Sequence, residues 1–233
     1  MRTPRVAIIG AGMSGIGMAV RLRNAGIETF RIYELRDGIG GTWHANRYPG
    51  LYCDVPSRNY QYRFAPNPNW SHLFSPGDEI RDYVEQVARD NGIVPHISFS
   101  TEVEEARFAD GEWTVRTKAG EEETFDFVIT AAGALVRPRT PDIPGLETFA
   151  GERCHSAEWD QSIGITGKRV AVIGTGSTGM QLTRAMAPVA SSFELFQRTP
   201  QWILPLVNPS YTGAGRAIMR RFHRVGTGGV GMR

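Results

Sequence analysis

The sequence predicts an α/β fold with two Rossmann-like dinucleotide-binding domains, the second of which is truncated. Two observations carry this prediction. First, a GxGxxG turn that begins at Gly10 follows an apolar strand and opens a helix. Second, the same strand–turn–helix pattern is repeated 164 residues later, where the turn begins at Gly174. We expect a first nucleotide-binding domain over residues 1–136, a linker over 137–166 and an incomplete second domain over 167–233.

The first unit starts with an apolar run at residues 5–9, which predicts a buried strand. GAGMSG follows, and apolar residues at helical spacing predict a helix over 16–25 that Gly26 ends. A second strand over 29–33 leads to Glu34. The motif glycines Gly10, Gly12 and Gly15 let the backbone turn tightly and approach a pyrophosphate, whose charge is met by the N–H groups and dipole of the helix.

Residues 37–76 are rich in glycine, proline, asparagine and aromatic side chains, which predicts a long ordered loop with short helical pieces. A helix over 77–91 follows, with an apolar stripe opposite charged residues. Short strands between 97 and 127, with turns at 109–111 and near Gly120, indicate an antiparallel hairpin layer.

A further strand is expected over 125–130. Pro138, Pro141 and Pro144 then stiffen a segment that marks the domain boundary.

The second unit repeats the first in order and spacing. An apolar strand is expected over 168–173, the GTGSTG turn at 174–179, a helix to about residue 187 and a strand over 193–197. Arg198 stands 19 residues after Gly179, as Glu34 stands 19 residues after Gly15. A carboxylate accepts both ribose hydroxyls and repels a 2′-phosphate, whereas a guanidinium pairs with that phosphate. The first site is therefore expected to take FAD or NAD, and the second NADPH.

Composition excludes several function classes. A hydrophobic share of 41% and a charged share of 21% exclude disorder as the main state, and a formal net charge of +2 gives no footprint for a nucleic-acid partner. Cys53 and Cys154 form neither a CxxC motif nor a metal-ligand cluster, so we expect no metal and a reduced, cytoplasmic compartment. No run of about 18 apolar residues occurs, so no membrane span is expected.

Two nucleotide units separated by a long insertion predict an oxidoreductase in which a hydride passes from a nicotinamide to a flavin. Between them, FAGERCHSAEWD resembles the FxGxxxHxxxW(P/D) fingerprint of Baeyer–Villiger monooxygenases. Phe149, Gly151, His155 and Trp159 occupy its fixed positions. His155 has no second histidine nearby that would indicate a metal, so we interpret it as a linker residue that organises hydrogen bonds.

The resemblance extends to GGTWHANRYPGLYCDVPS, which is similar to the flavin-contact loop of that family. It implies that Thr42 and Trp43 lie along the flavin, that Ser14 and Glu34 hold the FAD pyrophosphate and ribose, that Tyr60 lines the cofactor, and that Asp54 lies near its reacting end. It also implies an NADPH site made of Gly174, Thr175, Gly176, Ser177, Thr178, Gly179, Gln181, Arg198 and Thr199.

The implied function is oxidation of a small-molecule ketone to an ester or lactone with NADPH and O₂ through a peroxyflavin, with Asp54 as the catalytic carboxylate. In the family this carboxylate is paired with an arginine that lies beyond Arg233 in sequence order. Two alternatives stay open: a flavin monooxygenase that oxidises nitrogen or sulfur, which Trp159 disfavours, and a truncated, non-catalytic FAD-binding fragment.

The C-terminal part of the sequence predicts an incomplete second domain, whose apolar faces lack cover and could associate with another chain. Residues 215–225 have the pattern of a basic amphipathic helix, which either packs against further protein or lies on a membrane surface, and the first is favoured. Residues 226–233, GTGGVGMR, are expected to form no helix or strand.

Overall fold

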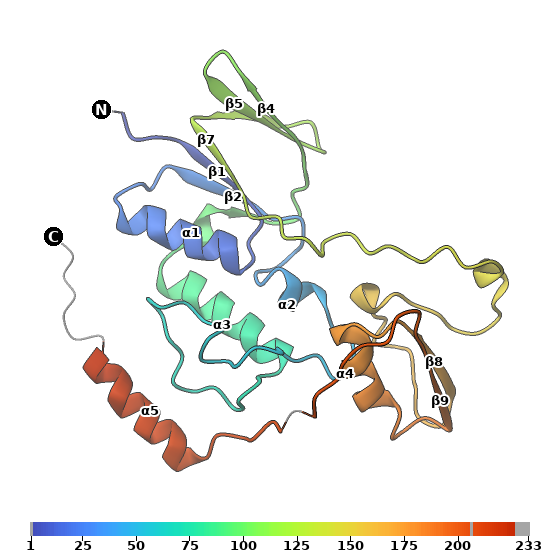
Figure 1. Cartoon of the computed structure of the whole chain (residues 1–233). Helices are drawn as coiled ribbons and strands as arrows, with labels where there is room; N and C mark the ends of the chain where they lie inside the picture. The colour runs from blue at the N-terminus through green and yellow to red at the C-terminus, as the bar shows by residue number, and fades with distance from the viewer. Residues whose placement is uncertain (1, 206, 227–233) are drawn as a thin grey trace. The chain divides into compact units, whose positions relative to one another are not determined.

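The computed structural model describes residues 2–205 and 207–226. The chain divides into two compact units, each built from two separate stretches of sequence (Figure 1). Unit 1 comprises residues 1–46 and 80–149, and unit 2 comprises residues 47–79 and 150–233. Of the final stretch expected to form no element, Gly226 ends the last helix and residues 227–233 lie outside the described part of the chain.

Unit 1 contains a parallel sheet in the order β3-β2-β1-β7. The strands are β1 (Val6–Ile9), β2 (Phe30–Tyr33), β3 (Ile97–Ser98) and β7 (Phe127–Thr130). Figure 1 shows α1 (Met13–Asn24) along this sheet, and its buried residues include Ile16, Ala19 and Val20. The predicted opening of a parallel α/β unit is confirmed.

Between residues 37 and 149 the chain forms one long helix and three short helical turns. The predicted loop over 37–76 contains one turn of helix, α2 (Thr42–Ala45). Helix α3 (Gly77–Asp90) agrees with the helix expected over 77–91, and η1 (Val94–His96) leads from it into β3. The chain leaves unit 1 after a 3-10 turn, η2 (Leu146–Thr148).

A three-stranded antiparallel layer, β4-β5-β6, forms the second sheet of unit 1. Its strands are β4 (Val103–Ala109), β5 (Glu112–Thr117) and β6 (Glu122–Phe125). Asp110 and Gly111 form the tight turn between the first two strands with φ of 54° and 89°. Ala7 and Tyr33 of the parallel sheet share a buried cluster with Val115 and Phe125 of this layer, so the two sheets pack face to face.

The strand expected over 125–130 is found as β7, but it begins two residues later than expected, because Phe125 ends β6 and the chain turns a corner at Asp126. The Asp126 carboxylate accepts a hydrogen bond from the Arg5 backbone N–H at 2.6 Å, and the Asp126 N–H donates to the Arg5 carbonyl oxygen at 2.9 Å. These bonds hold the corner beside the start of β1. The chain thereby passes from the antiparallel layer into the parallel sheet within one residue.

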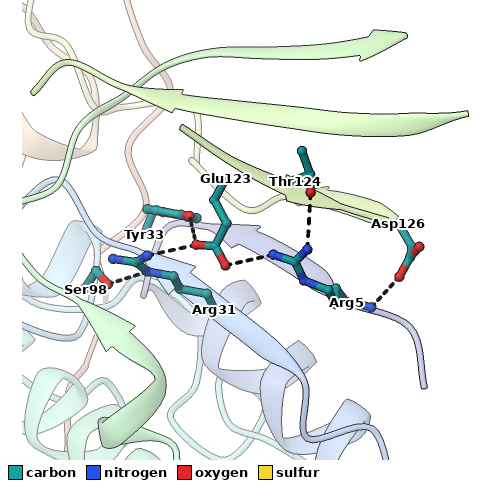
Figure 2. A network of polar contacts seen from close by, with 7 residues as sticks. All are labelled: Arg5, Arg31, Tyr33, Ser98, Glu123, Thr124 and Asp126. Atoms are coloured by element: carbon teal, nitrogen blue, oxygen red, sulfur yellow. Dashed lines mark hydrogen bonds and ion pairs between the residues drawn. The ribbon is translucent and has the colours of Figure 1, made fainter. Parts of the chain in front are cut away.

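A polar network joins the two sheets beside this corner (Figure 2). Glu123 accepts hydrogen bonds from Arg31 at 2.8 Å, Tyr33 at 3.0 Å and Arg5 at 3.1 Å. Burial acts to raise the pKa of Glu123, but the hydrogen bonds from Arg31, Tyr33 and Arg5 outweigh it, so the pKa lies below its usual value. Burial and the hydrogen bond to Glu123 raise the pKa of Tyr33, which keeps this hydroxyl a donor.

Replacing Glu123 by Gln is expected to lower the unfolding free energy by about 1 kcal/mol at pH 7, since the network is partly exposed to solvent. Because the pKa of Glu123 is lowered on folding, its contribution is present above the unfolded pKa and is lost as the pH falls through the folded value. Urea unfolding at pH 7 and at about pH 3 should show this difference shrinking on acidification. Glu122→Gln, at a more exposed neighbouring carboxylate, is the control; an equal loss in both variants would contradict the assignment.

Unit 2 contains the second strand–turn–helix unit. Strands β8 (Arg169–Ile173) and β9 (Ser192–Phe196) pair in parallel and α4 (Ser177–Met186) connects them. A buried cluster of Tyr48, Val172, Leu182 and Met186 forms its core. The unit also contains η3 (Ser156–Glu158) and α5 (Gly213–Gly226), which agrees with the amphipathic helix expected over 215–225.

Unit 2 exposes several large apolar side chains. Ile173 and Phe196, partners at the end of the two-stranded sheet, are 58% and 52% exposed, and Trp202 is fully exposed. Association through these faces stays a prediction. Among the described residues no helix is long and apolar enough to cross a membrane, and no group of three or more His, Cys, Asp or Glu side chains is arranged to hold a metal ion.

Candidate functional site

The first glycine turn has the shape that close approach of a phosphate requires. Gly10 follows β1 with φ of 104° and donates its N–H to the Tyr33 carbonyl oxygen at 2.8 Å. A Cβ at Gly15 would collide with the Gly10 carbonyl oxygen, so only glycine lets α1 start this close to the turn. Gly12 is the N-cap residue of α1 and has no side chain to cap the helix, which leaves the first N–H groups of α1 available to an anion.

Glu34 lies beyond the end of β2 and is 6% exposed. Its two carboxylate oxygens accept hydrogen bonds from the backbone N–H of Ala11 at 2.6 Å and of Arg36 at 2.9 Å. The carboxylate therefore lies against the glycine turn, where the spacing in the sequence predicts it. A carboxylate has further lone pairs, so these two bonds leave it able to accept ribose hydroxyls.

Two consecutive glycines bring the residues that are predicted to contact the flavin to the same turn. Gly40 donates its N–H to the Ala11 carbonyl oxygen at 3.1 Å, and a Cβ at Gly41 would come within 2.9 Å of the Gly12 Cα. Helix α2 begins directly after this contact, with Thr42 and Trp43 as its first residues. Unit 1 thus gathers Gly10, Gly12, Gly15, Glu34, Thr42 and Trp43 in one region, and Ser14 is exposed in the first turn of α1.

The second glycine turn repeats the first in detail. Gly174 has φ of 111° and donates its N–H to the Phe196 carbonyl oxygen at 2.9 Å, as Gly10 does to Tyr33. A Cβ at Gly179 would collide with the Gly174 carbonyl oxygen. Gly176 is the N-cap residue of α4, with no capping side chain, and a Cβ added there would meet nothing within 4 Å. This turn can therefore admit a pyrophosphate.

Arg198 and Thr199 follow β9 and are exposed. Within the described part of the chain, Arg198 makes no ion pair, so its guanidinium is available to an anionic ligand. Thr175, Ser177 and Thr178 belong to the glycine turn and the first turn of α4. The predicted dinucleotide residues of unit 2 thus lie at the carboxyl ends of β8 and β9 and at the start of α4.

Asp54 also belongs to unit 2, which the sequence does not indicate. Its carboxylate accepts a hydrogen bond from the Ser177 hydroxyl at 2.8 Å. Gln181, one turn further along α4, is 4% exposed and accepts a hydrogen bond from the Tyr48 hydroxyl at 2.9 Å. Burial raises the pKa of Tyr48, which keeps this hydroxyl protonated and able to donate. The loop with Asp54 therefore rests on the helix that the second glycine turn opens.

The same loop is fixed to unit 2 at a second place. The Asn208 side chain accepts from the Phe74 N–H and donates to the Phe74 carbonyl oxygen, both at 2.9 Å. The Leu73 N–H donates to the Pro209 carbonyl oxygen at 3.1 Å. Tyr60, half-buried, lies within this loop.

Sequence reasoning missed three residues that support the Asp54 loop on α4: Tyr48, Gly50 and Tyr52. It missed them because pairing with α4 leaves no periodic signal in a loop.

The four fingerprint residues have separate surroundings. Phe149 is 59% exposed at the end of the second stretch of unit 1, and Gly151 is exposed. His155 accepts a hydrogen bond from the Ala157 N–H at 3.1 Å through Nδ1 and so caps η3. Trp159 packs against the buried cluster of unit 2.

One polar cavity of about 470 Å³ is lined by Arg31, Tyr33, Thr117, Glu121, Glu122 and Glu123 of unit 1. None of the predicted cofactor residues lines it. It adjoins the network in Figure 2, in which Arg31 and Tyr33 donate to Glu123 across the two sheets. The Thr117 hydroxyl accepts the Glu121 N–H within the antiparallel layer.

Comparison with known proteins gives a consistent result. The flavin-binding monooxygenase-like family matches residues 3–226. An uncharacterised monooxygenase of Mycobacterium tuberculosis is 51% identical over 226 residues, which is 97% of this chain and 46% of the relative. A Baeyer–Villiger monooxygenase of Streptomyces coelicolor is 45% identical over 218 residues, covering 93% of this chain and 42% of the relative.

Solved structures agree. An open crystal structure of cyclohexanone monooxygenase matches with a TM-score of 0.88 and 35% identity, covering 97% of this chain and 45% of that one. A steroid monooxygenase bound to NADP matches with a TM-score of 0.86 and 37% identity, covering 97% and 44%. A complex of OTEMO with FAD and NADP gives a TM-score of 0.87 at 35% identity. The chain spans a little under half the length of the relatives it matches.

Proposed function

The chain belongs to the flavin-binding monooxygenase-like family, and from this premise we propose that it serves NADPH- and O₂-dependent Baeyer–Villiger oxidation of a small-molecule ketone, with FAD on unit 1 and NADPH on unit 2. In this reaction one oxygen atom of O₂ enters the bond beside the ketone carbonyl to give an ester or lactone. The other leaves as water, with NADPH supplying the hydride and a proton coming from solvent. The membership confirms the resemblance that the fingerprint predicts.

The observation that carries the proposal is the pair of equivalent glycine turns, each of which opens an uncapped helix. On unit 1, Gly10, Gly12, Ser14 and Gly15 would receive the FAD pyrophosphate, and Glu34 would accept the ribose hydroxyls. Thr42 and Trp43 directly follow Gly41, which lies in close contact with Gly12, and they would lie along the flavin. Tyr60 would line the cofactor. Bound FAD supplies the chemistry that activates O₂.

On unit 2, the turn from Gly174 to Gly179 would hold the NADPH pyrophosphate, and Arg198 with Thr199 the 2′-phosphate. Asp54 is the proposed catalytic carboxylate. Its hydrogen bond from Ser177 fixes it in the unit that would carry the nicotinamide nucleotide. The extents 1–136 and 167–233 for the cofactor domains and the cytoplasmic location remain proposals.

The test is the visible absorption spectrum of the purified chain after incubation with FAD and removal of free cofactor. We expect a retained flavin spectrum, and NADP⁺ binding in a separate calorimetric titration. Glu34→Lys should abolish FAD retention, because it removes the carboxylate that would accept the ribose hydroxyls and that accepts the N–H groups of Ala11 and Arg36, and it leaves an unpaired ammonium at a buried position. It should leave NADP⁺ binding unchanged because Glu34 belongs to unit 1. A colourless wild-type protein would overturn the proposal for this chain.

With flavin retained, the next measurement is NADPH oxidation with and without cyclic or linear ketones, together with detection of the ester or lactone. NADPH consumption that no ketone accelerates, with no ester formed, would contradict the Baeyer–Villiger assignment while leaving the cofactor assignment intact.

A further inference from the structure

The segment that carries Asp54, residues 47–54, is fixed on α4 by one buried carboxamide. The Tyr52 N–H donates to Gln181 Oε1 at 3.3 Å, and Gln181 Nε2 donates to the Tyr52 carbonyl oxygen at 3.0 Å. The same Oε1 also accepts from the Tyr48 hydroxyl, which in turn receives a hydrogen bond from Thr178 Oγ1 at 3.4 Å. Both ends of the carboxamide are thus used on this segment.

The backbone of the segment crosses α4 in direct contact. Gly50 has φ of 78°, and a Cβ there would come within 2.9 Å of both the Gln181 carbonyl oxygen and the Ala185 Cβ. A side chain at this position would push the segment off the helix. Tight contact at Gly50 and the carboxamide at Gln181 therefore act on the same few residues, directly before Asp54.

The chemistry of the carboxamide explains why glutamine suits this position. The backbone of Tyr52 presents an N–H donor and a carbonyl acceptor. A primary amide side chain can form both hydrogen bonds, because it has an acceptor oxygen and a donor nitrogen. Methionine has a similar length and fills the same space without these hydrogen bonds. Glutamate keeps the two acceptor bonds, but when ionised it has no donor for the Tyr52 carbonyl oxygen.

We propose that Gln181 is a positioning residue for Asp54: it holds the segment on α4, so that Asp54 stands at Ser177 beside the second glycine turn. This inference rests on the proposed function, in which Asp54 is the catalytic carboxylate and the turn holds NADPH. The family resemblance counts Gln181 among the NADPH residues, but both ends of its carboxamide are bonded to Tyr48 and Tyr52. In this proposal Gln181 therefore acts through these two residues, and the dinucleotide is bound by the turn itself and by Arg198.

Cys53 gives a local readout in the full chain. It is 1% exposed between Tyr52 and Asp54, and burial raises the pKa of its thiol, whereas Cys154 is exposed and provides an internal reference. The experiment measures the rate of alkylation of each cysteine by mass spectrometry in wild type, Gln181→Met and Gln181→Glu. Thr183→Ala is the control, because Thr183 lies on the same helix and its hydroxyl donates to the Gly179 carbonyl oxygen within that helix. NADP⁺ affinity of each variant is measured by calorimetry.

We expect the Cys53 rate, relative to Cys154, to rise by about tenfold or more in Gln181→Met, because three hydrogen bonds that hold the segment closed are lost. Gln181→Glu should restore part of the protection, Thr183→Ala should match wild type, and the Kd for NADP⁺ should stay within about twofold in Gln181→Met, since a residue that does not touch the ligand leaves its binding energy unchanged.

A Cys53 rate in Gln181→Met within about twofold of wild type would overturn the proposal, because it would mean that Gln181 only fills space. So would a loss of NADP⁺ affinity with Cys53 still protected, which would make Gln181 a dinucleotide ligand. If Gln181→Met does not fold, Gln181→Glu and Tyr48→Phe carry the same comparison. Failure of wild type to bind NADP⁺ would count against the proposed function alone, since the alkylation result is independent of it.

Discussion

Gly179→Ala is expected to abolish NADP⁺ binding and to destabilise unit 2, so that unit 2 no longer unfolds in a cooperative transition. A Cβ at Gly179 collides with the Gly174 carbonyl oxygen, which is backbone and cannot move aside as a flexible side chain does. Overpacking of this kind costs about 1–3 kcal/mol or more. Gly179 lies in the strand–turn–helix unit of unit 2, whose described sheet has two strands packed on the cluster of Tyr48, Val172, Leu182 and Met186, so this small core has to absorb the cost. Thermal and urea unfolding, followed by Trp fluorescence, should show the loss of stability.

Gly176→Ala is the matched variant at the other end of the motif. Gly176 has φ of −67° and ψ of 178°, a conformation that alanine adopts freely, and a Cβ there meets nothing within 4 Å. We expect stability within about 0.5 kcal/mol of wild type. The Kd for NADP⁺ should nevertheless rise by about tenfold or more, because the methyl group occupies the space through which the pyrophosphate approaches the backbone.

The pair separates a folding glycine from a binding glycine. Unchanged NADP⁺ affinity in a folded Gly176→Ala protein would show that the dinucleotide does not approach this turn. A Gly179→Ala protein with wild-type stability would show that α4 can shift away from Gly174 at little cost. Either result would remove a specific part of the geometric argument for the second nucleotide site.

The two strand–turn–helix units could be predicted from the sequence because their signals are local. Apolar strands of four or five residues, glycines at fixed spacing and helical periodicity are all contained within about 25 residues. The positions of Glu34 and Gly10 follow from that spacing alone, and the structure places the Glu34 carboxylate against the turn. The same locality explains why the hairpin at Asp110 and Gly111 is confirmed.

The parts that could not be predicted depend on partners distant in sequence. The corner at Asp126 is set by hydrogen bonds to Arg5, 121 residues earlier, so the sequence gives no sign that Phe125 ends one strand and Phe127 begins the next. Likewise, the Asp54 segment belongs to unit 2 because Tyr48 and Tyr52 meet Gln181 well over 100 residues away. A glycine- and aromatic-rich loop carries no period from which such pairing can be read.

Arg198→Gln should change the choice between the two nicotinamide nucleotides. Arg198 is exposed two residues beyond β9 and would pair with the 2′-phosphate that distinguishes NADP⁺ from NAD⁺. Charge-assisted hydrogen bonds contribute about 1.5–3 kcal/mol, so the Kd for NADP⁺ should rise by about 10- to 100-fold. The Kd for NAD⁺ should stay unchanged, because NAD⁺ has no 2′-phosphate. Calorimetric titration of each variant with both nucleotides measures the two constants.

Arg169→Gln is the control for this prediction, because Arg169 is also exposed but begins β8, at the opposite end of the same two-stranded sheet. It removes one positive charge at a distance from the glycine turn, so both Kd values should stay the same except for the small long-range electrostatic effect of that charge. Added salt should weaken NADP⁺ binding to wild type more than to Arg198→Gln, since the pair with the phosphate is solvent-exposed. Equal loss of NAD⁺ and NADP⁺ affinity in Arg198→Gln would instead mean that Arg198 contacts a part that both nucleotides share, and the predicted preference for NADPH would lose its physical basis.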